Sequence, residues 1–293
     1  MRKTFLNEIA QIIPKEEDTV FFTVDIGMWA IQSTLSEYPE RCMNVGIYED
    51  GMTSIAAGLS MAGFVPIIFG IQPYIIERNF EQIKMDFAYH KLNGNFIGTG
   101  AAVDYSKYGY SHYCAEDYAV LKMIPGVEFV APGTPKQFLK LFRQAYRDGK
   151  PTFFRISDHP NHTEVEVEFG KATVVRRGNK ATIIVVSVML DCALQALGDE
   201  DVTILYYTTL EPFDRETLIR NISGDKIMIC EPQYEGSMVY DVISALKGRN
   251  VQVEMVGFPR EIFRNYGTYD EKLDFYNINA KSIYKKYKEL LGE

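Results

Sequence analysis

The sequence predicts an α/β protein of two domains, each a mostly parallel sheet flanked by helices. Short apolar runs without polar alternation recur along the chain, as is typical of strands buried on both faces. Helical patterns separate consecutive runs, and such alternation with short connections indicates parallel sheets. The chain has 293 residues, of which 46% are apolar and 24% charged, which is enough for two hydrophobic cores.

In the first half of the chain, segment 1–18 has the pattern of an amphipathic helix. In a later helical segment Ile76, Phe80, Ile83 and Phe87 recur at spacings of three and four residues. We expect strands at 19–27, 44–49, 64–70, 94–100, 127–132 and 151–157, and further helices at 52–63, 76–92 and 135–149.

The alternation breaks over a polar, unperiodic stretch that contains Pro160 and the histidines His159 and His162. We therefore expect a first domain at 1–160, a linker at 161–174 and a second domain at 175–293. In the second domain we expect strands at 181–188, 202–210, 226–232 and 251–258, and helices at 189–198, 214–223, 237–248 and 281–291.

Charge and cysteine content exclude several classes of protein. A net charge of −8 argues against a nucleic-acid partner or an anionic membrane surface. The cysteines Cys42, Cys114, Cys192 and Cys230 form no C-x-x-C pair, which favours reduced thiols and a cytoplasmic location. We expect no signal peptide, no membrane span and no metal ligand on this chain, and His159 and His162 to be solvated.

Ligands of open parallel sheets bind beyond the carboxyl ends of the strands. Glu49 and Asp50 follow one predicted strand, and Asp50 suits the role of helix N-cap. Capping leaves Glu49 unexplained, so Glu49 is either a surface residue or a functional one. Arg155 ends another apolar strand, where it could pair with a carboxylate or hold an anionic ligand.

A long loop follows the strand predicted at 94–100. His112 lies in it together with four tyrosines, and a loop of this length in a compact domain is usually functional or mobile. The tyrosines are Tyr105, Tyr108, Tyr110 and Tyr113.

The stretch VGIYEDGMTSIAAGLSMAGFVPI, which starts at residue 45, resembles the segment of transketolase-type thiamine-diphosphate enzymes that carries their catalytic glutamate. The family pattern is Gly-x-x-Glu, then Met-x-x-x-Ala-x-Gly-x-Ala-x-x-Gly, then Pro. The resemblance continues through 78–85, 111–135 and 151–157 and through the second domain, so it covers most of the chain. The matching positions are Gly46, Glu49, Met52, Ala56, Gly58, Gly63 and Pro66, with Ser60 at the second alanine.

This resemblance implies roles for particular residues. Glu49 would contact the N1′ nitrogen of the aminopyrimidine and activate the cofactor, thiamine diphosphate. Tyr74 falls where the family stacks an aromatic ring, usually Phe, on the pyrimidine, and Asp25 matches an acidic position in the first strand-end loop. His112 matches the active-site histidine beside the reacting substrate, and Arg155 matches an arginine that often holds the substrate phosphate.

The family binds Mg²⁺ and the cofactor diphosphate through a Gly-Asp-Gly motif, which this chain lacks. The resemblance therefore implies the C-terminal, or beta, subunit of a split transketolase, active only with an N-terminal, or alpha, subunit. That partner would hold most of the diphosphate and Mg²⁺. By resemblance we expect a heterotetramer.

Departures from the family pattern bear on the substrate. The loop 103–113 lacks the family's Glu-Asp-Gly, and Lys107 or Tyr108 falls near the position that contacts a sugar hydroxyl. Trp29 replaces a phosphate-contacting serine, and Gly98 replaces a phosphate-contacting histidine. The tyrosines and Trp29 could form a wall for a larger or uncharged acceptor, or the tyrosines could pack against the partner subunit.

We therefore expect a transferase that moves a two-carbon ketol or acyl unit to a small-molecule carbonyl acceptor other than a plain pentose phosphate. Two alternatives stay open. One is the beta subunit of a 2-oxo-acid dehydrogenase, and the other is a non-catalytic assembly or regulatory subunit.

Overall fold

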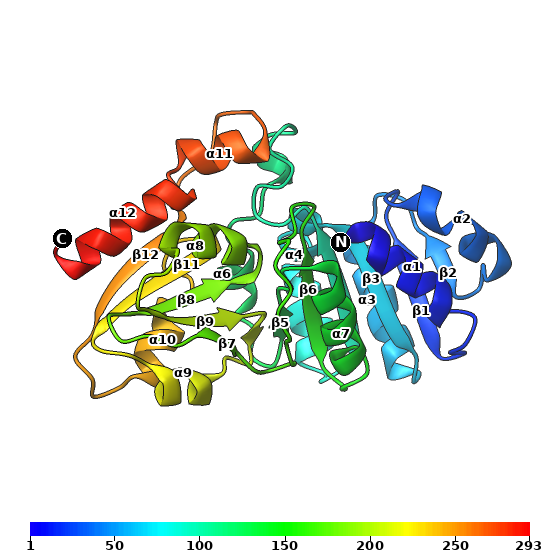
Figure 1. Ribbon diagram of the computed structural model, residues 1–293. Coiled ribbons are helices and arrows are strands. Elements are labelled where there is room, and N and C mark those ends of the chain that lie inside the picture. Colours follow the sequence, from blue (N-terminus) through cyan, green and yellow to red (C-terminus); the bar gives the residue numbers. More distant parts are fainter.

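Two sheets of mostly parallel strands lie side by side in the computed structural model, which describes residues 1–293 (Figure 1). Helices cover both sheets, so the predicted fold class is confirmed. No helix combines the length and the apolar character that a membrane span needs.

The first sheet has seven strands in the order β10-β5-β6-β4-β3-β1-β2. All of its neighbouring pairs are parallel except β10 with β5. The strands are β1 (Thr19–Thr23), β2 (Cys42–Asn44), β3 (Val65–Ile71), β4 (Gly94–Thr99), β5 (Glu128–Val130), β6 (Pro151–Ile156) and β10 (Thr209–Glu211).

Side chains alternate between the two faces of this sheet, because successive strand residues point to opposite sides. Phe21 and Phe69 face the aromatic ring of Phe5 on helix α1. Phe22 and its neighbours belong to a separate hydrophobic cluster on the other face. The elements around this sheet are α1 (Arg2–Ile12), α2 (Met28–Glu37), α3 (Glu49–Met61), α4 (Gln72–Ile76), α5 (Phe80–Gln82), the π-helix η1 (Ile83–Ala88), the 3₁₀ helix η2 (Tyr110–His112), α6 (Asp117–Leu121) and α7 (Pro135–Ala145).

The second sheet has five strands in the order β12-β11-β8-β9-β7, and β7 runs antiparallel to β9. Its strands are β7 (Thr173–Arg176), β8 (Thr182–Val186), β9 (Thr203–Tyr207), β11 (Lys226–Tyr234) and β12 (Gln252–Phe258). The helical elements around it are the 3₁₀ helix η3 (Ser187–Met189), α8 (Leu190–Leu197), α9 (Arg215–Asn221), α10 (Val239–Ala245), α11 (Tyr269–Phe275) and α12 (Ala280–Leu291).

The two sheets share the apolar run 202–210, which the sequence predicts as a single strand. Tyr207 ends β9 in the second sheet, and Thr209 already pairs with Val130 in the first. The backbone N–H of Ala131 donates to the carbonyl of Thr208 at 2.7 Å, so the crossing begins with a bond to the first sheet. The crossing segment covers the otherwise open edge of β5. The division of the chain at 161–174 stays a prediction.

The predicted strand 44–49 is wrong beyond its first residue. β2 ends at Asn44, and the chain turns at Gly46, whose φ is 72°. Glu49 and Asp50 then occupy the first turn of α3, with Tyr48 rather than Asp50 as the N-cap. Carboxylates are favoured at this end of a helix by the helix dipole.

The helix predicted at 76–92 is also wrong in part, because it is interrupted. α4 ends at Ile76, α5 has three residues, and the following turn is π-helical.

The space around Gly98 is too small for a side chain. A Cβ at this position would lie 2.5 Å from the ring of Phe153 and 3.3 Å from the Cα of Gln72. The first residue of α4 therefore lies directly against β4, and the histidine that the family pattern places here would not fit.

We predict that Gly98→Ala lowers the free energy of unfolding by about 1–3 kcal/mol, since the new methyl group overpacks the space between β4 and α4. Gly58→Ala is the matched control, because Gly58 lies within α3 with open space around it. The control is expected to stabilise by about 0.5–1 kcal/mol. Urea unfolding measures both, and equal effects would contradict this account of Gly98.

Candidate active site

A cavity of about 370 Å³ lies at the carboxyl edge of the first sheet. Ile26 follows β1, Ile71 ends β3 and Asp158 follows β6, so three strand ends meet there. This is where open parallel sheets bind ligands, and the volume is large enough for a small molecule. The lining residues are Arg2, Ile26, Ile71, Tyr105, Tyr108, His112 and Asp158.

The imidazole of His112 is surrounded by tyrosine rings. Its centroid lies 5.7 Å from that of Tyr74, 6.5 Å from that of Tyr105 and 5.3 Å from that of Tyr108. Its Nδ1 lies 3.0 Å from the Oγ of Ser111. The ring is therefore oriented by aromatic contacts and by one hydroxyl group.

Glu49 reaches this group of rings through an arginine. Its side chain is 2% exposed, and its Oε2 accepts a hydrogen bond from Nη1 of Arg78 at 2.6 Å. The guanidinium carbon of Arg78 lies 4.6 Å from the ring centroid of Tyr74. Glu49, Arg78, Tyr74 and His112 thus form one continuous series of contacts.

Sequence reasoning proposed Glu49, Tyr74 and His112 for the site, and the structure brings them together, but it missed Arg78. A signal was present in the spacing, because Arg78 follows Tyr74 by four residues, although Tyr74 lies in α4 and Arg78 lies in the turn after it.

Asp25 orders the loop after β1. Its backbone N–H donates to Oδ1 of Asn44 at 3.0 Å, and Nδ2 of Asn44 donates to its Oδ1 at 2.7 Å. Asp25 directly precedes Ile26, so these two bonds shape one edge of the cavity.

Of the residues proposed as a substrate wall, Tyr105 and Tyr108 line the cavity together, whereas Tyr110, Tyr113 and Trp29 do not line it. Tyr108 lines the cavity, and Lys107 of the same loop is exposed and does not. Trp29 projects from α2 with 67% of its surface exposed and does not line the cavity either.

Arg155 does not reach the cavity. Its side chain is 1% exposed, and its Nη1 donates to both carboxylate oxygens of Asp117, at 3.2 and 3.1 Å. The same nitrogen donates to Oε1 of Gln233 at 2.9 Å, and Gln72 also donates to Asp117. Of the two roles left open for Arg155, the structure shows the pairing with a carboxylate. A contact with substrate phosphate does not fit so buried a guanidinium.

Glu231 extends this buried network into the second sheet. Its Oε1 accepts from the backbone N–H of Gly236 at 2.6 Å, and its Oε2 accepts from Nε2 of Gln233 at 3.0 Å. Burial raises the pKa of Glu231 to about 8, so this carboxyl group is protonated at neutral pH. Burial also raises the pKa of Asp117, against the charge of Arg155.

Comparison with known proteins identifies the family. Residues 1–159 match the family described as "Transketolase, pyrimidine binding domain". The chain belongs to this family. The match agrees with the resemblance carried by Glu49 and the small-residue helix that follows it.

Relatives of similar length support a split transketolase. The chain is 28% identical to an uncharacterized 33.6 kDa protein in the fasciation locus of Rhodococcoides fascians, over 93% of this chain and 89% of that one. It is 27% identical to a subunit of the apulose-4-phosphate transketolase of Phocaeicola vulgatus, over 91% and 92%. It shares its fold with a solved split gene transketolase, an inactive beta4 tetramer, with a TM-score of 0.87, 24% identity and coverage of 99% and 98%.

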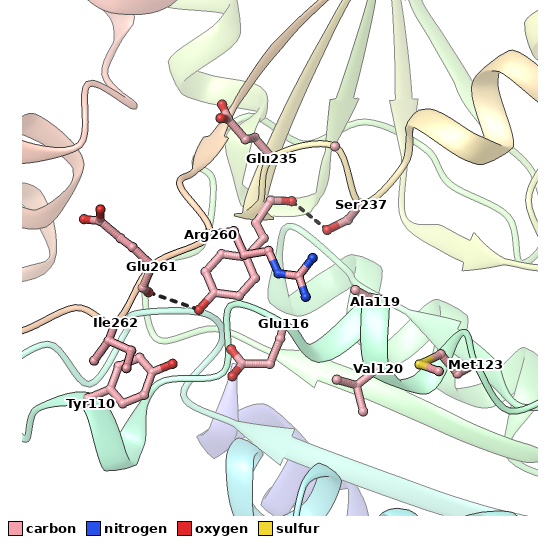
Figure 2. Close-up of a pocket in the computed structure, with 12 residues that line it drawn as sticks. Tyr110, Glu116, Ala119, Val120, Met123, Glu235, Ser237, Arg260, Glu261 and Ile262 are labelled. Carbon is pink, nitrogen blue, oxygen red and sulfur yellow. Dashed lines mark hydrogen bonds between the residues drawn. The ribbon is translucent and has the colours of Figure 1, made fainter.

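A second cavity of this transketolase-family chain, about 590 Å³ in volume, lies between α6 and the loops that follow β11 and β12 (Figure 2). Arg260 reaches into it beside Glu116. The hydroxyl of Ser237 donates to the carbonyl of Tyr234, and the hydroxyl of Tyr234 donates to the carbonyl of Glu261. Of the loop tyrosines singled out from the sequence, Tyr110 lines this cavity, and none of the other residues proposed for the site does.

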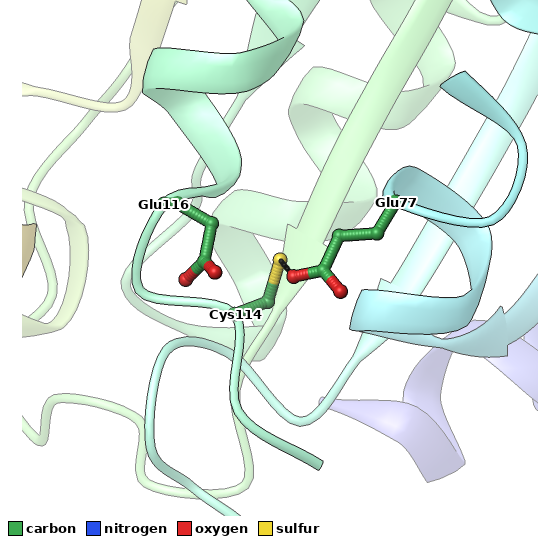
Figure 3. Close-up of side chains that lie close together, drawn as sticks. All are labelled: Glu77, Cys114 and Glu116. Atoms are coloured by element: carbon green, nitrogen blue, oxygen red, sulfur yellow. Dashed lines mark hydrogen bonds between the residues drawn. The ribbon is translucent and has the colours of Figure 1, made fainter. Parts of the chain in front are cut away.

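Glu77, Cys114 and Glu116 crowd together near α4 and α6 (Figure 3). Cys114 donates from Sγ to Oε1 of Glu77 at 3.7 Å. Burial and the charge of Glu116 raise the pKa of Glu77 to about 7, and burial raises that of the Cys114 thiol. Burial therefore disfavours the charged forms of these three side chains.

We predict that Glu231→Gln reduces the pH dependence of stability. A carboxyl group whose folded pKa is raised from 4.5 to about 8 stabilises the fold fully below pH 4.5. That contribution is lost as the pH rises through 8. The free energy of unfolding of the wild type should therefore fall more than that of Glu231→Gln between pH 5 and about pH 8.5.

The matched control is Glu235→Gln, an exposed glutamate four residues away. It should keep the wild-type dependence. Denaturant unfolding at the two pH values measures both variants, and parallel curves for the wild type and Glu231→Gln would contradict a protonated Glu231.

Proposed function

We propose that this chain is the C-terminal subunit of a split, thiamine-diphosphate-dependent transketolase. It transfers a two-carbon ketol or acyl unit to a carbonyl acceptor other than a plain pentose phosphate. The observation that carries the proposal is the buried Glu49 at the start of α3, connected through Arg78 and Tyr74 to His112 at the strand-end cavity.

The residues present fit an aminopyrimidine. Oε2 of Glu49 accepts from Arg78, while its Oε1 has no hydrogen-bond partner within the chain. That second oxygen is available to hold a proton against a ring nitrogen. The bound cofactor would supply a nucleophilic carbon that attacks the carbonyl group of a substrate.

The other residues of the site act on orientation and on proton transfer. Arg78 donates a hydrogen bond to the carboxylate of Glu49 and lies over the ring of Tyr74. It therefore sets the position of the Glu49 carboxylate relative to the Tyr74 ring. His112 borders the cavity and can exchange a proton with an acceptor carbonyl. Asp25 holds the β1 loop through Asn44.

The proposed enzyme includes a partner subunit, as the name of the Phocaeicola vulgatus relative suggests. This chain contains no Gly-Asp-Gly motif, so Mg²⁺ and the cofactor diphosphate would be held mainly by an alpha subunit that has one. Large apolar side chains around Glu49 are exposed, with Ile47 at 75%, Tyr48 at 54% and Ile55 at 49%, which supports a partner surface there. The names of the relatives, one a transketolase subunit and one an inactive beta4 tetramer, support a chain that associates with other subunits. We propose a heterotetramer in the cytoplasm.

Calorimetric titration of thiamine diphosphate with Mg²⁺ tests this function. We expect tight binding to the mixture of this chain with the subunit that carries the Gly-Asp-Gly motif, and weak binding to either alone. Glu49→Ala should weaken binding by about 10- to 100-fold, the loss expected for a hydrogen bond to a charged group.

Asp50→Asn is the matched control, because Asp50 is an exposed carboxylate in the same helical turn. It should bind the cofactor as the wild type does. Absence of binding in the mixture, or equal affinity of Glu49→Ala and the wild type, would rule the proposal out. A non-catalytic subunit would show equal affinity of Glu49→Ala and the wild type for the cofactor.

A further inference from the structure

A phosphorylated substrate needs cationic donors, because a phosphate group is bound by charge-assisted hydrogen bonds from Arg or Lys. Two charged residues, Arg2 and Asp158, line the cavity beside His112. Lys107 of the neighbouring loop does not line it. The cavity wall therefore contributes one cation and one anion.

The family resemblance predicts that Arg155, near the end of β6, binds an anion. In the structure, the residue near this strand end that lines the cavity is Asp158. Arg155 is fully buried and committed to Asp117 and Gln233. Asp158, three residues further along, is exposed and lines the cavity in its place.

Asp104 fixes the position of Asp158. The Oγ of Ser157 donates to Oδ1 of Asp104 at 3.1 Å, and the backbone N–H of Asp158 donates to its Oδ2 at 2.7 Å. Burial raises the pKa of Asp104 to about 7, against the hydrogen bonds from Asp158 and Ser157, which lower it. A second carboxyl group therefore lies directly behind the one that faces the cavity, and burial disfavours its charged form.

Arg2 is the single cation among the lining residues. Its Nη1 donates a long hydrogen bond of 3.4 Å to the hydroxyl of Tyr105, and Asp158 opposes its charge within the same cavity. The remaining wall consists of the phenols of Tyr105 and Tyr108, the imidazole of His112 and two isoleucines. Hydroxyl groups and ring faces of this kind suit a neutral, hydroxylated ligand.

We propose that this cavity takes a hydroxylated aldehyde without a phosphate group, and that Asp158 is the residue that sets this specificity. The inference rests on the proposed function, and it names the acceptor class of that same site.

The test uses the complete complex with its partner subunit, thiamine diphosphate and Mg²⁺. Hydroxypyruvate is the donor, and the two acceptors are glyceraldehyde and glyceraldehyde 3-phosphate, which differ by the phosphate. The bond between the carboxylate carbon and the ketone carbon of hydroxypyruvate breaks with release of CO₂. Its electron pair ends in the new bond to the aldehyde carbon of the acceptor, whose oxygen takes a proton from solvent. No oxidant is consumed.

We expect the wild type to prefer glyceraldehyde by about tenfold or more in kcat/KM, a difference of about 1.4 kcal/mol. Asp158→Asn should reduce the preference for glyceraldehyde over glyceraldehyde 3-phosphate. Asp158→Arg should reverse this preference by lowering KM for the phosphorylated acceptor. Thiamine diphosphate affinity should stay unchanged in both variants. Glu164→Arg makes the same change of charge at an exposed position that does not line the cavity, so it should keep the wild-type ratio.

A wild type that prefers the phosphorylated acceptor, and loses that preference in Arg2→Gln, would overturn the proposal, since Arg2 would then be a phosphate ligand. An unchanged ratio in Asp158→Arg would also overturn it. If the complex binds the cofactor and turns over neither acceptor, the acceptor class is wrong and the cofactor function stands. If the complex does not bind the cofactor, the proposed function fails, and this inference fails with it.

Discussion

The buried ion pair between Arg155 and Asp117 is the interaction on which the arrangement of the two halves depends. Arg155 is the penultimate residue of β6 in the first sheet, and Gln233, which it also contacts, belongs to β11 of the second. Both charges are inaccessible to water, so each needs the other to offset its desolvation. Nε and Nη2 of Arg155 have no hydrogen-bond partner, which leaves Nη1 as the nitrogen that makes the contacts.

This network also places the candidate site. Gln72 donates to Asp117 and is the first residue of α4, which carries Tyr74 and leads to Arg78. Arg78 in turn holds Glu49. The position of the proposed cofactor contacts therefore follows from a polar core between the sheets.

Much of this could be predicted from the sequence. Uninterrupted apolar runs predicted the parallel strands, and the spacing after Glu49 indicated the family. The burial of Arg155 could not be predicted, because Asp117 is 38 and Gln233 is 78 residues away along the chain. The run 202–210 consists of β-branched, aromatic and leucine residues that all favour a strand, so its pattern does not predict the crossing between sheets at Thr208. The helix that starts at Glu49 follows a turn at Gly46, which has a positive φ. The residues around Gly46 have a strand-like pattern, so this turn could not be predicted.

A double-mutant cycle on Arg155→Met and Asp117→Leu, followed by urea unfolding without ligands, tests the central claim most directly. Each single change leaves an unpaired buried charge and should cost about 3–5 kcal/mol. The double variant should cost less than the sum, with a coupling of about 1–3 kcal/mol. If each change lowers the free energy of unfolding only slightly and the two effects add, the ion pair is not structural. Arg155 would then again be a candidate for contact with substrate.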